Sequence, residues 1–543
     1  MTSQEFKAKA TTLIDDLKGV CANYGLGNDG NEFKIITQVF LYKFLNDKFA
    51  HEVKRIEPDL AKAKSWEDAL RRKSRSAYEL ILMQLGADTA RLKPEHFLST
   101  LWAKQNDDSF AVTFDATLLD IAKLNADIFS VKTNDGQRIV LFDSVTQYVA
   151  SQRDAFAKAI INKLIPFSFE HIFAEKFDFY ATLFEYLIKD YNKDGGGKYA
   201  EYYTPHAVAK IMAACLVPRK VKNVSCYDPA AGSGTLLMNL AHAIGEDRCT
   251  IYTQDISQKS SSLLRLNLIL NNLVHSIPNV IQGNTILEPY HKEDSGAGLR
   301  KFDYIVSNPP FKLDFSDFRD QLDTKANRRR FFAGIPNVLN KSKDKMAIYL
   351  LFLQHIIHSL DKSGRAAVVV PTGFITAQTG IESNIRKYLV DNKMLGGVIS
   401  MPSNIFATTG TNVSILFIDT TNQNEIVLID ASNLGEKVRE GKNQKTLLSH
   451  EDERLIIGTF NEKRTVEKLS IVVSYDQIAA KGYSFSAGQY FEAKTEYVDL
   501  SRREFGAKVD EFSDRLEALY RESRHLETAI RRQMASLEYG KTS

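Results

Sequence analysis

Hydrophobic positions follow two different patterns along the chain, and the change falls near residue 190. Before it, apolar residues recur every three or four positions, as in FKIITQVFLYKFLNDKF (33–49) and FDFYATLFEYLIKDY (177–191), which predicts helices. The segment KDGGGK (193–198) then breaks the pattern, because adjacent glycines destabilise a helix and give the backbone freedom. We therefore expect a helical domain over residues 1–190 that contacts a partner or DNA.

After this boundary, short apolar runs alternate with helical stretches. KNVSCYD precedes TLLMNLAHAI, CTIYTQD precedes SSLLRLNLILNN, FDYIVSN precedes MAIYLLFLQHIIHSL, and RAAVVVP follows as a further strand. Alternation of this kind predicts a doubly wound, mostly parallel α/β sheet of Rossmann-like type over residues 191–500. The runs GGVISM and NVSILFID predict extra strands at one edge. Ligands of such sheets bind at the carboxyl ends of the strands.

The segment 501–543 carries a third pattern. It has no proline, and apolar residues return at intervals that are mostly three and four, although Ser523 interrupts them. They are Phe505, Val509, Phe512, Leu516, Leu519, Leu526, Ile530, Met534 and Leu537. This spacing is typical of a coiled-coil seam. We expect a C-terminal helix for subunit association, with packing on its own domain as the alternative.

Composition limits the classes of protein to consider. With 543 residues, 44% hydrophobic and 25% charged, the chain is long enough for two or three soluble domains. The net charge of +3 neither demands nor excludes nucleic acid. No apolar leader and no run of about 18 apolar residues occurs, so we expect a cytoplasmic protein that does not span a membrane. The scattered cysteines, Cys21, Cys215, Cys226 and Cys249, argue against structural zinc and for reduced thiols.

Two strand ends carry residues suited to a cofactor. In YDPAAGSGTLL, Asp228 starts a tight loop, and Gly232 and Gly234 let the backbone approach a ligand before a helix opens at Thr235. The loop has neither the lysine of a Walker motif nor the third glycine of a dinucleotide fingerprint. The next strand ends at Asp255, whose carboxylate can bind both hydroxyls of a ribose. Together they predict a nucleoside-bearing cofactor, whereas a plain turn and a solvated aspartate are the alternatives.

Further cofactor residues flank these strands. Asn284, at the third strand end, can give and take hydrogen bonds with an adenine edge. In KYAEYYTPHAVAKIM, Thr204 is expected as the N-cap of a helix and Pro205 as its first residue. Two tyrosines beside a helix N-terminus suit a ligand with a carboxylate and a cationic centre. S-adenosylmethionine has both, although a helix start without a ligand is the alternative.

The fourth strand ends in SNPPF (307–311), which as a local feature could be a strand terminator. Beside a cofactor site it acquires a chemical role. The amino group of adenine is a poor nucleophile, and acceptors for both its hydrogens would leave its lone pair facing the methyl donor. We expect the Asn308 side-chain oxygen and the Pro309 carbonyl to be these acceptors. Phe311 would stack on the base, which must be flipped out of the duplex.

The ordered motifs resemble those of a known family: the modification subunit of type I restriction-modification systems, a gamma-class adenine amino methyltransferase. The resemblance runs from the helical N-terminal region through YYTP, DPAAGSG, Asp255 and NPPF to the C-terminal helix. It implies S-adenosylmethionine as cofactor, held by Glu201, Tyr202, Tyr203, Thr204, Pro205, His206, Ser233, Gly234, Thr235 and Asp255, and a target base held by Asn308, Pro309, Pro310 and Phe311. Asn284 stands where many such enzymes have Asp, and Phe311 replaces the commoner Tyr.

The resemblance also implies partners. Two modification subunits join one specificity subunit, a restriction subunit is a further component, and the substrate is double-stranded DNA. Residues 400–500 are too short for strands and a complete target-recognition domain. Sequence reading is therefore expected to come from the partner.

Three other functions fit part of the pattern. A protein-glutamine methyltransferase would face the same nitrogen chemistry, and a non-catalytic assembly subunit would keep the motifs. A nicotinamide-dependent dehydrogenase would explain the glycine loop and Asp255 but leave SNPPF without a role. The cluster KANRRRF (325–331) is suited to phosphate contact or to a solvated loop. His355 and His358 lack nearby ligand partners in the sequence, so no metal site is expected.

Overall fold

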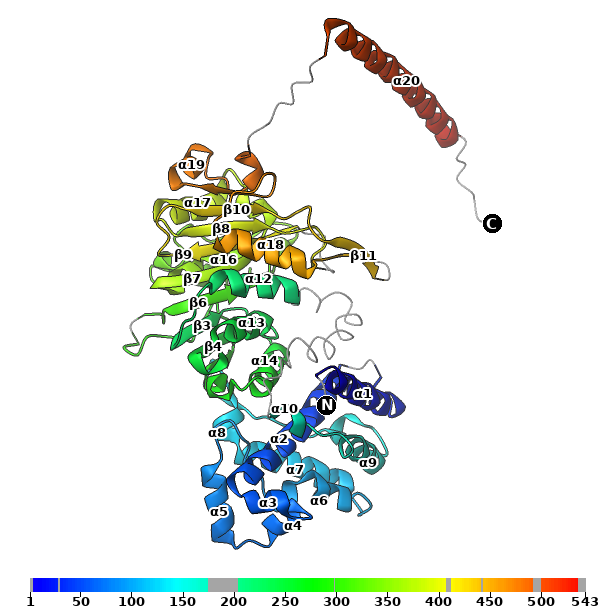
Figure 1. Cartoon of the computed structure of the whole chain (residues 1–543), viewed down its shortest axis with the longest axis vertical. Coiled ribbons are helices and arrows are strands. Elements are labelled where there is room, and N and C mark those ends of the chain that lie inside the picture. The colour runs from blue at the N-terminus through cyan, green and yellow to red at the C-terminus, as the bar shows by residue number, and fades with distance from the viewer. Residues whose placement is uncertain are drawn as a thin grey trace. The chain divides into compact units, whose positions relative to one another are not determined.

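The computed structural model describes residues 3–27, 30–173, 204–296, 298–406, 412–440, 443–491 and 500–535 (Figure 1). The chain divides into two compact units, Met1–Phe491 and Glu492–Ser543. The proposed boundary at 193–198 and the helix expected over 177–191 lie outside the described residues. In the part of the chain that is described, no helix is both long and apolar enough to cross a membrane.

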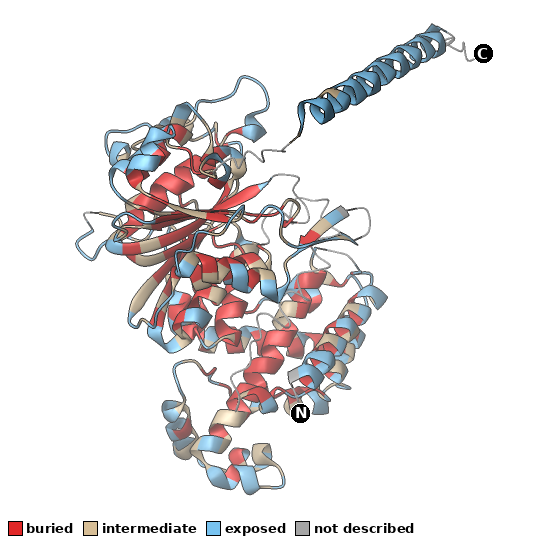
Figure 2. Cartoon of the chain, turned by 45° about the horizontal axis from the view of Figure 1, so that its top comes forward, coloured by how far each residue is buried: buried red, intermediate tan, exposed pale blue. Residues whose placement is uncertain are grey.

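Helices make up most of the N-terminal region, as the spacing of apolar residues predicts. They are α1 (Ser3–Asn23), α2 (Glu32–Ile56), α3 (Pro58–Lys62), α4 (Trp66–Arg71), α5 (Arg75–Gln84), α6 (Leu98–Ala103), α7 (Phe110–Leu124), α8 (Ala126–Phe129), α9 (Arg153–Leu164) and α10 (Glu170–Phe173). Helix α2 is buried on most of its faces (Figure 2). Its buried Lys43 and Asp47 form an ion pair of 3.0 Å, which compensates the cost of burying both charges.

The N-terminal region also contributes two strands, β1 (Val131–Thr133) and β2 (Arg138–Ile139), which the sequence pattern did not predict. They form a hairpin, and β1 pairs in parallel with β5 (Val280–Gln282) at the edge of the main sheet. Such short strands carry too few residues to show an alternating pattern. The hairpin joins the helical region to the sheet as one unit.

The main sheet has eleven strands in the order β13-β10-β8-β9-β7-β6-β3-β4-β5-β1-β2. Its other strands are β3 (Val224–Asp228), β4 (Cys249–Asp255), β6 (Phe302–Ser307), β7 (Leu360–Pro371), β8 (Leu395–Ser400), β9 (Val413–Asp419), β10 (Ile426–Asp430) and β13 (Ser470–Val473). Strands β7, β6, β3, β4 and β5 are all parallel, which confirms the predicted fold class. A separate hairpin consists of β11 (Glu436–Glu440) and β12 (Asn443–Leu447).

The prediction that GGVISM and NVSILFID lie at an edge is wrong. They form β8 and β9, which lie inside the sheet because β10 and β13 add two more strands beyond β8. Strand β9 runs antiparallel to both β7 and β8. Pairing of β10 and β13 depends on residues far apart in sequence, so local pattern could not reveal it.

Helices cover both faces of the sheet, as alternate residues of β7 show. Ala367 and Val369 join the core that contains residues of α12 (His206–Leu216), α13 (Thr235–Ile244), α14 (Gln258–Leu270) and α18 (His450–Asn461). Ala366, Val368 and Val370 join the core with α16 (Tyr349–Ser359), α17 (Gly380–Asp391) and α19 (Tyr475–Ala480). A short helix, α15 (Arg319–Leu322), lies between β6 and α16. This two-sided burial explains why the strands are apolar throughout.

The second unit contains α20 (Arg502–Ala535), a helix of 34 residues in which no residue is buried (Figure 2). The predicted helix is therefore present over these residues. Its apolar side chains are exposed, with Phe512 64% and Leu519 55% accessible. Leu537, the last member of the predicted seam, lies outside the described residues.

Candidate active site

The order of the strands places the candidate residues around one point of the sheet. From β3 the chain proceeds through β4 to β5 on one side, and β6 and β7 lie on the other, so the topology switches between β3 and β6. Ligands of open α/β sheets bind at such a switch point. Asp228 ends β3 and Ser307 ends β6, and the Ser307 hydroxyl donates a 2.8 Å hydrogen bond to Asp228 Oδ1. The two predicted motifs therefore meet directly.

The glycine loop after β3 has the conformation that its sequence suggests. Gly232 and Gly234 have φ of 53° and 87°, in the left-handed region that residues other than glycine rarely adopt. Gly234 precedes α13, and a Cβ at this position would also collide with Leu264 of α14. The N-terminus of α13 therefore follows a loop whose backbone a ligand can approach closely.

A residue that sequence reasoning missed holds this loop against α14. Asn267 is completely buried, and its Nδ2 donates a 2.8 Å hydrogen bond to the carbonyl of Ser233. Ser233 and Thr235 hydroxyls lie 3.2 Å apart within the loop. The available signal was a single asparagine among the apolar residues of LRLNLIL, which a buried helix tolerates when its amide has a partner.

Asp255 lies at the end of β4 with its carboxylate beside the same loop. Its Oδ2 accepts a 2.9 Å hydrogen bond from the Gly232 N–H, and its Oδ1 accepts one of 2.8 Å from the Ser257 N–H. Burial raises the pKa of Asp255, and these two donors oppose the rise. Each oxygen keeps a second lone pair, so the carboxylate is still able to accept hydrogen bonds from two ribose hydroxyls.

Asp228 is buried, with 1% of its surface exposed. Its Oδ1 accepts hydrogen bonds from the Ala230 N–H and the Ser307 hydroxyl. The pKa of Asp228 is raised to about 7. Burial is the largest cause; the two donors lower the pKa, and the negative charge of Asp255 raises it. A buried carboxyl of this kind favours a cationic ligand, because a positive charge would stabilise its ionised form.

The side-chain oxygen of Asn284 forms hydrogen bonds within its own loop. Its Oδ1 accepts 3.1 Å hydrogen bonds from the N–H groups of Ile286 and Leu287 in the loop after β5. The side-chain acceptor is therefore used within the loop, which leaves the amide Nδ2 as the group for an adenine edge. This asparagine forms the kind of local side-chain turn that makes the residue common at strand ends.

The start of α12 differs from the prediction by one residue. Helix α12 begins at His206, Pro205 is its N-cap, and Thr204 makes no capping hydrogen bond. Thr204 is 4% exposed, and its hydroxyl instead accepts a 3.1 Å hydrogen bond from Asn308 Nδ2. The competing partner on another strand explains the error, because no local pattern contains it. Glu201, Tyr202 and Tyr203 lie outside the described residues.

His206 is not brought to the strand ends with the other candidates. It lines a small cavity with Met238 and His242, which belong to the middle and C-terminal part of α13. Its Nδ1 is buried, and no described residue forms a hydrogen bond with it. The geometry therefore supports packing of this side chain against α13 rather than a contact at the glycine loop.

Asn308, Pro309, Pro310 and Phe311 follow β6 directly. Thr204 holds the Nδ2 of Asn308, and none of the described residues donates a hydrogen bond to its Oδ1. The Phe311 ring is partly exposed and lies edge-on to Tyr349, with 6.1 Å between the centroids and an interplanar angle of 70°. An acceptor oxygen and an aromatic ring thus lie beside the switch point, and the proline backbone restricts their positions.

The basic cluster 325–331 divides into two parts. Arg330 is 3% exposed, donates from Nη2 to the carbonyl of Ile286, and lies 4.3 Å from the centroid of the Phe331 ring. It therefore anchors the segment to the loop after β5. Lys325, Arg328 and Arg329 are exposed, so these three remain as candidates for phosphate contact.

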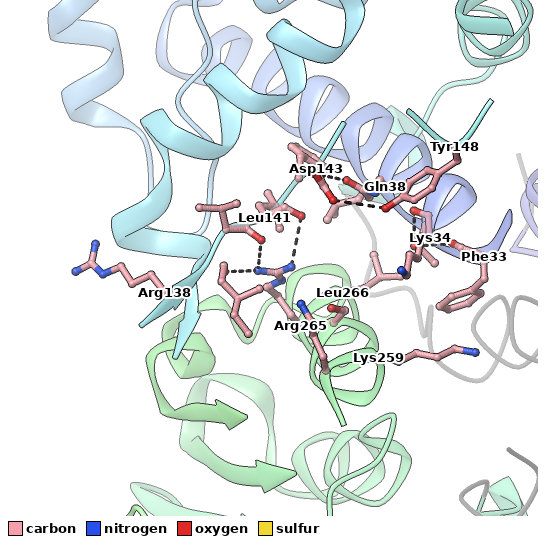
Figure 3. A pocket seen from close by; sticks show the side chains of 17 residues that line it. Phe33, Lys34, Gln38, Arg138, Leu141, Asp143, Tyr148, Lys259, Arg265 and Leu266 are labelled. Carbon is pink, nitrogen blue, oxygen red and sulfur yellow. Dashed lines mark hydrogen bonds between the residues drawn. The ribbon is translucent and has the colours of Figure 1, made fainter. Parts of the chain in front are cut away.

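A cavity of about 620 Å³ lies elsewhere, between α2, the β2 segment and α14 (Figure 3). At its wall the buried Arg265 donates hydrogen bonds to the carbonyls of Phe129, Ile139, Val140 and Leu141. Burial lowers the pKa of this guanidinium to about 10. Arg265 fastens the N-terminal region to α14, and its hydrogen-bond donors are used for that purpose.

The two histidines of α16, His355 and His358, lie in buried or partly buried positions. His355 is buried, and its Nε2 lies 3.1 Å from the Tyr227 hydroxyl. Burial lowers the pKa of His355 well below its usual value and that of His358 to about 4. Among the described residues, no group of three or more His, Cys, Asp or Glu side chains is placed to hold a metal ion.

An open α/β sheet with a glycine loop, a strand-end carboxylate and an Asn-Pro-Pro-Phe segment at its switch point defines the class of amino methyltransferases. The model of the N-6 DNA Methylase family matches residues 175–499, more than half of the chain. The chain belongs to this family.

Individual relatives agree with the family. The methylase subunit of the type I restriction enzyme MpnII of Mycoplasma pneumoniae is 29% identical over 345 residues, which are 62% of this chain and 61% of that protein. The MjaIX methylase subunit of Methanocaldococcus jannaschii is 24% identical over 70% of this chain and 67% of its own length. The match thus spans about three fifths of the first relative.

A solved structure shows a similar fold. The type I restriction-modification system methyltransferase subunit from Streptococcus thermophilus superposes with a TM-score of 0.70 at 20% identity, over 91% of this chain and 100% of that one. The similarity therefore extends beyond the residues that the family model matches.

Proposed function

We propose that this chain methylates the exocyclic amino group of adenine in DNA, using S-adenosylmethionine, as the modification subunit of a type I restriction-modification complex in the cytoplasm. Family membership supports the reaction, and the relatives that are methylase subunits support the complex. The observation that carries the proposal is the position of Asn308, whose amide lies at the switch point beside the glycine loop with its oxygen directed to no described donor.

The residues at the strand ends fit the cofactor. Gly232 and Gly234 allow close approach of the backbone, Asp255 keeps acceptor sites for a ribose, and the buried Asp228 favours a cationic group. When bound, the cofactor would supply an electrophilic methyl group with a thioether as the leaving group, and the methylated amino nitrogen would release its proton to solvent. The chain's contribution is to hold both reactants in place.

Asn308 and Pro309 would bind the target base. Their oxygens accept the two amino hydrogens and so localise the nitrogen lone pair, which needs no strong base in the site. Phe311 would stack on the base and offset part of the few kcal/mol needed to flip it. A specificity subunit, with two modification subunits for each, would choose the sequence, and a restriction subunit would complete the assembly.

Transfer of labelled methyl from S-adenosylmethionine to unmethylated DNA tests the proposal. The complex purified from its host is expected to label adenine, the chain alone to label little, and the complex with Asn308→Ala to lose at least about a hundredfold in rate. Asn271→Ala, at the C-terminal end of α14, is the matched control and should retain activity. Label on a copurifying protein instead of DNA would favour a glutamine methyltransferase, and cofactor binding without transfer would favour an assembly subunit.

A further inference from the structure

Thr204 joins the segment before α12 to the catalytic loop after β6. The two residues are 104 positions apart, yet Asn308 Nδ2 donates to Thr204 Oγ1 at 3.1 Å. Thr204 is 4% exposed, so water competes little for its hydroxyl. The bond therefore links the segment expected to bind the cofactor with the segment expected to bind the target base.

This hydrogen bond anchors one end of the Asn308 amide. A hydroxyl can accept from Nδ2 or donate to Oδ1, so the bond fixes the position of the amide and does not by itself choose between its two ends. With Nδ2 on the hydroxyl, Oδ1 lies on the opposite side. Oδ1 is the atom that must accept a hydrogen from the target amino group, and among the described residues it has no other donor.

We propose that Thr204 is a positioning residue for methyl transfer, whose hydroxyl anchors the Asn308 amide so that its oxygen stays beside the target amino group. The inference rests on the proposed function and adds a role for Thr204 that does not require contact with the cofactor. Without the hydroxyl, the amide loses this anchor and leaves the position in which Oδ1 accepts a hydrogen from the target amino group. Transfer slows, whereas binding of the cofactor and flipping of the base continue.

The test compares Thr204→Val, which keeps the shape but removes the hydroxyl, with Thr204→Ser, which keeps the hydroxyl. Both are made in the complete complex. The valine variant is expected to lose about tenfold or more in kcat, with the KM for DNA and the Kd for S-adenosylmethionine changed less than about twofold. The serine variant should recover most of kcat. Fluorescence of 2-aminopurine at the target position should show that the base still flips.

Thr253→Val is the matched control. Thr253 is completely buried in β4, and within the described part of the chain its hydroxyl has no hydrogen-bond partner, so the same substitution should leave kcat unchanged. An unchanged or increased kcat in Thr204→Val would overturn the inference. A loss of cofactor affinity and thermal stability in both Thr204 variants would also overturn it, since it would indicate a structural role at the start of α12. Absence of methylation by the unaltered complex would instead reject the proposed function itself.

Discussion

Asp228 is a residue where function and stability oppose each other. Burial raises its pKa to about 7, so the folded chain disfavours the ionised form that the unfolded chain adopts above pH 4. The group therefore costs the fold free energy that increases as pH rises from about 4 to 7 and is constant above that. A pKa near 7 corresponds to a cost of about 4 kcal/mol at pH 8.

Asp228→Asn should therefore stabilise the cofactor-free chain. Its Oδ1 can still accept the hydrogen bonds from Ala230 and Ser307, while the buried charge is removed. In urea unfolding at pH 8 the variant should gain up to about 4 kcal/mol, and the gain should shrink toward zero as pH falls to 4. Affinity for S-adenosylmethionine should fall in the same variant. A gain that does not depend on pH would contradict this account.

At the scale of elements, the glycine loop combines a strained backbone conformation with close packing. Gly234→Ala should destabilise the chain by about 2–4 kcal/mol, from the left-handed φ of 87° and from contact with Leu264. Urea unfolding measures the loss, and equilibrium dialysis should show weaker binding of S-adenosylmethionine.

Gly136→Ala separates the two causes. Gly136 has a φ of 85° but open space where a Cβ would lie, so its variant should lose about 1–2 kcal/mol and keep its cofactor affinity. Equal losses at both positions would mean that packing against α14 is unimportant.

The local sequence predicts some parts of the candidate site and not others. The glycine loop, the strand end at Asp255 and the SNPPF segment follow strands that the apolar runs predict correctly, because these strands are buried on both faces. The partner of Asn308, the support of the loop by Asn267 and the internal position of β8 and β9 depend on contacts between distant segments. Local periodicity contains no information about such pairs.

At the scale of the whole molecule, α20 presents apolar side chains that its own unit does not cover. Removal of residues 492–543 should leave the unfolding free energy and cofactor affinity of the unit Met1–Phe491 unchanged, because this unit is compact by itself. The same truncation should abolish association with the proposed specificity subunit in size-exclusion chromatography. A truncated chain that still enters the complex would show that another surface binds the partner.

Substitutions within the helix sharpen this test. Leu516 and Leu519 are 51% and 55% exposed, so Leu516→Glu with Leu519→Glu should not destabilise the free chain but should prevent assembly. Arg531→Gln, in the same helix, breaks only an exposed pair with Glu527 and serves as the control.

The sequence by itself determined the alternation of strands and helices, the residues at the strand ends and the amphipathic C-terminal helix, because these depend on local spacing and backbone preference. The tertiary structure decided which of those residues meet. It brought Ser307 to Asp228 and Thr204 to Asn308, placed His206 against α13, and buried Arg330 out of the basic cluster. Each of these contacts joins segments distant in sequence or depends on burial, which arises only when the sheet and its helices pack together.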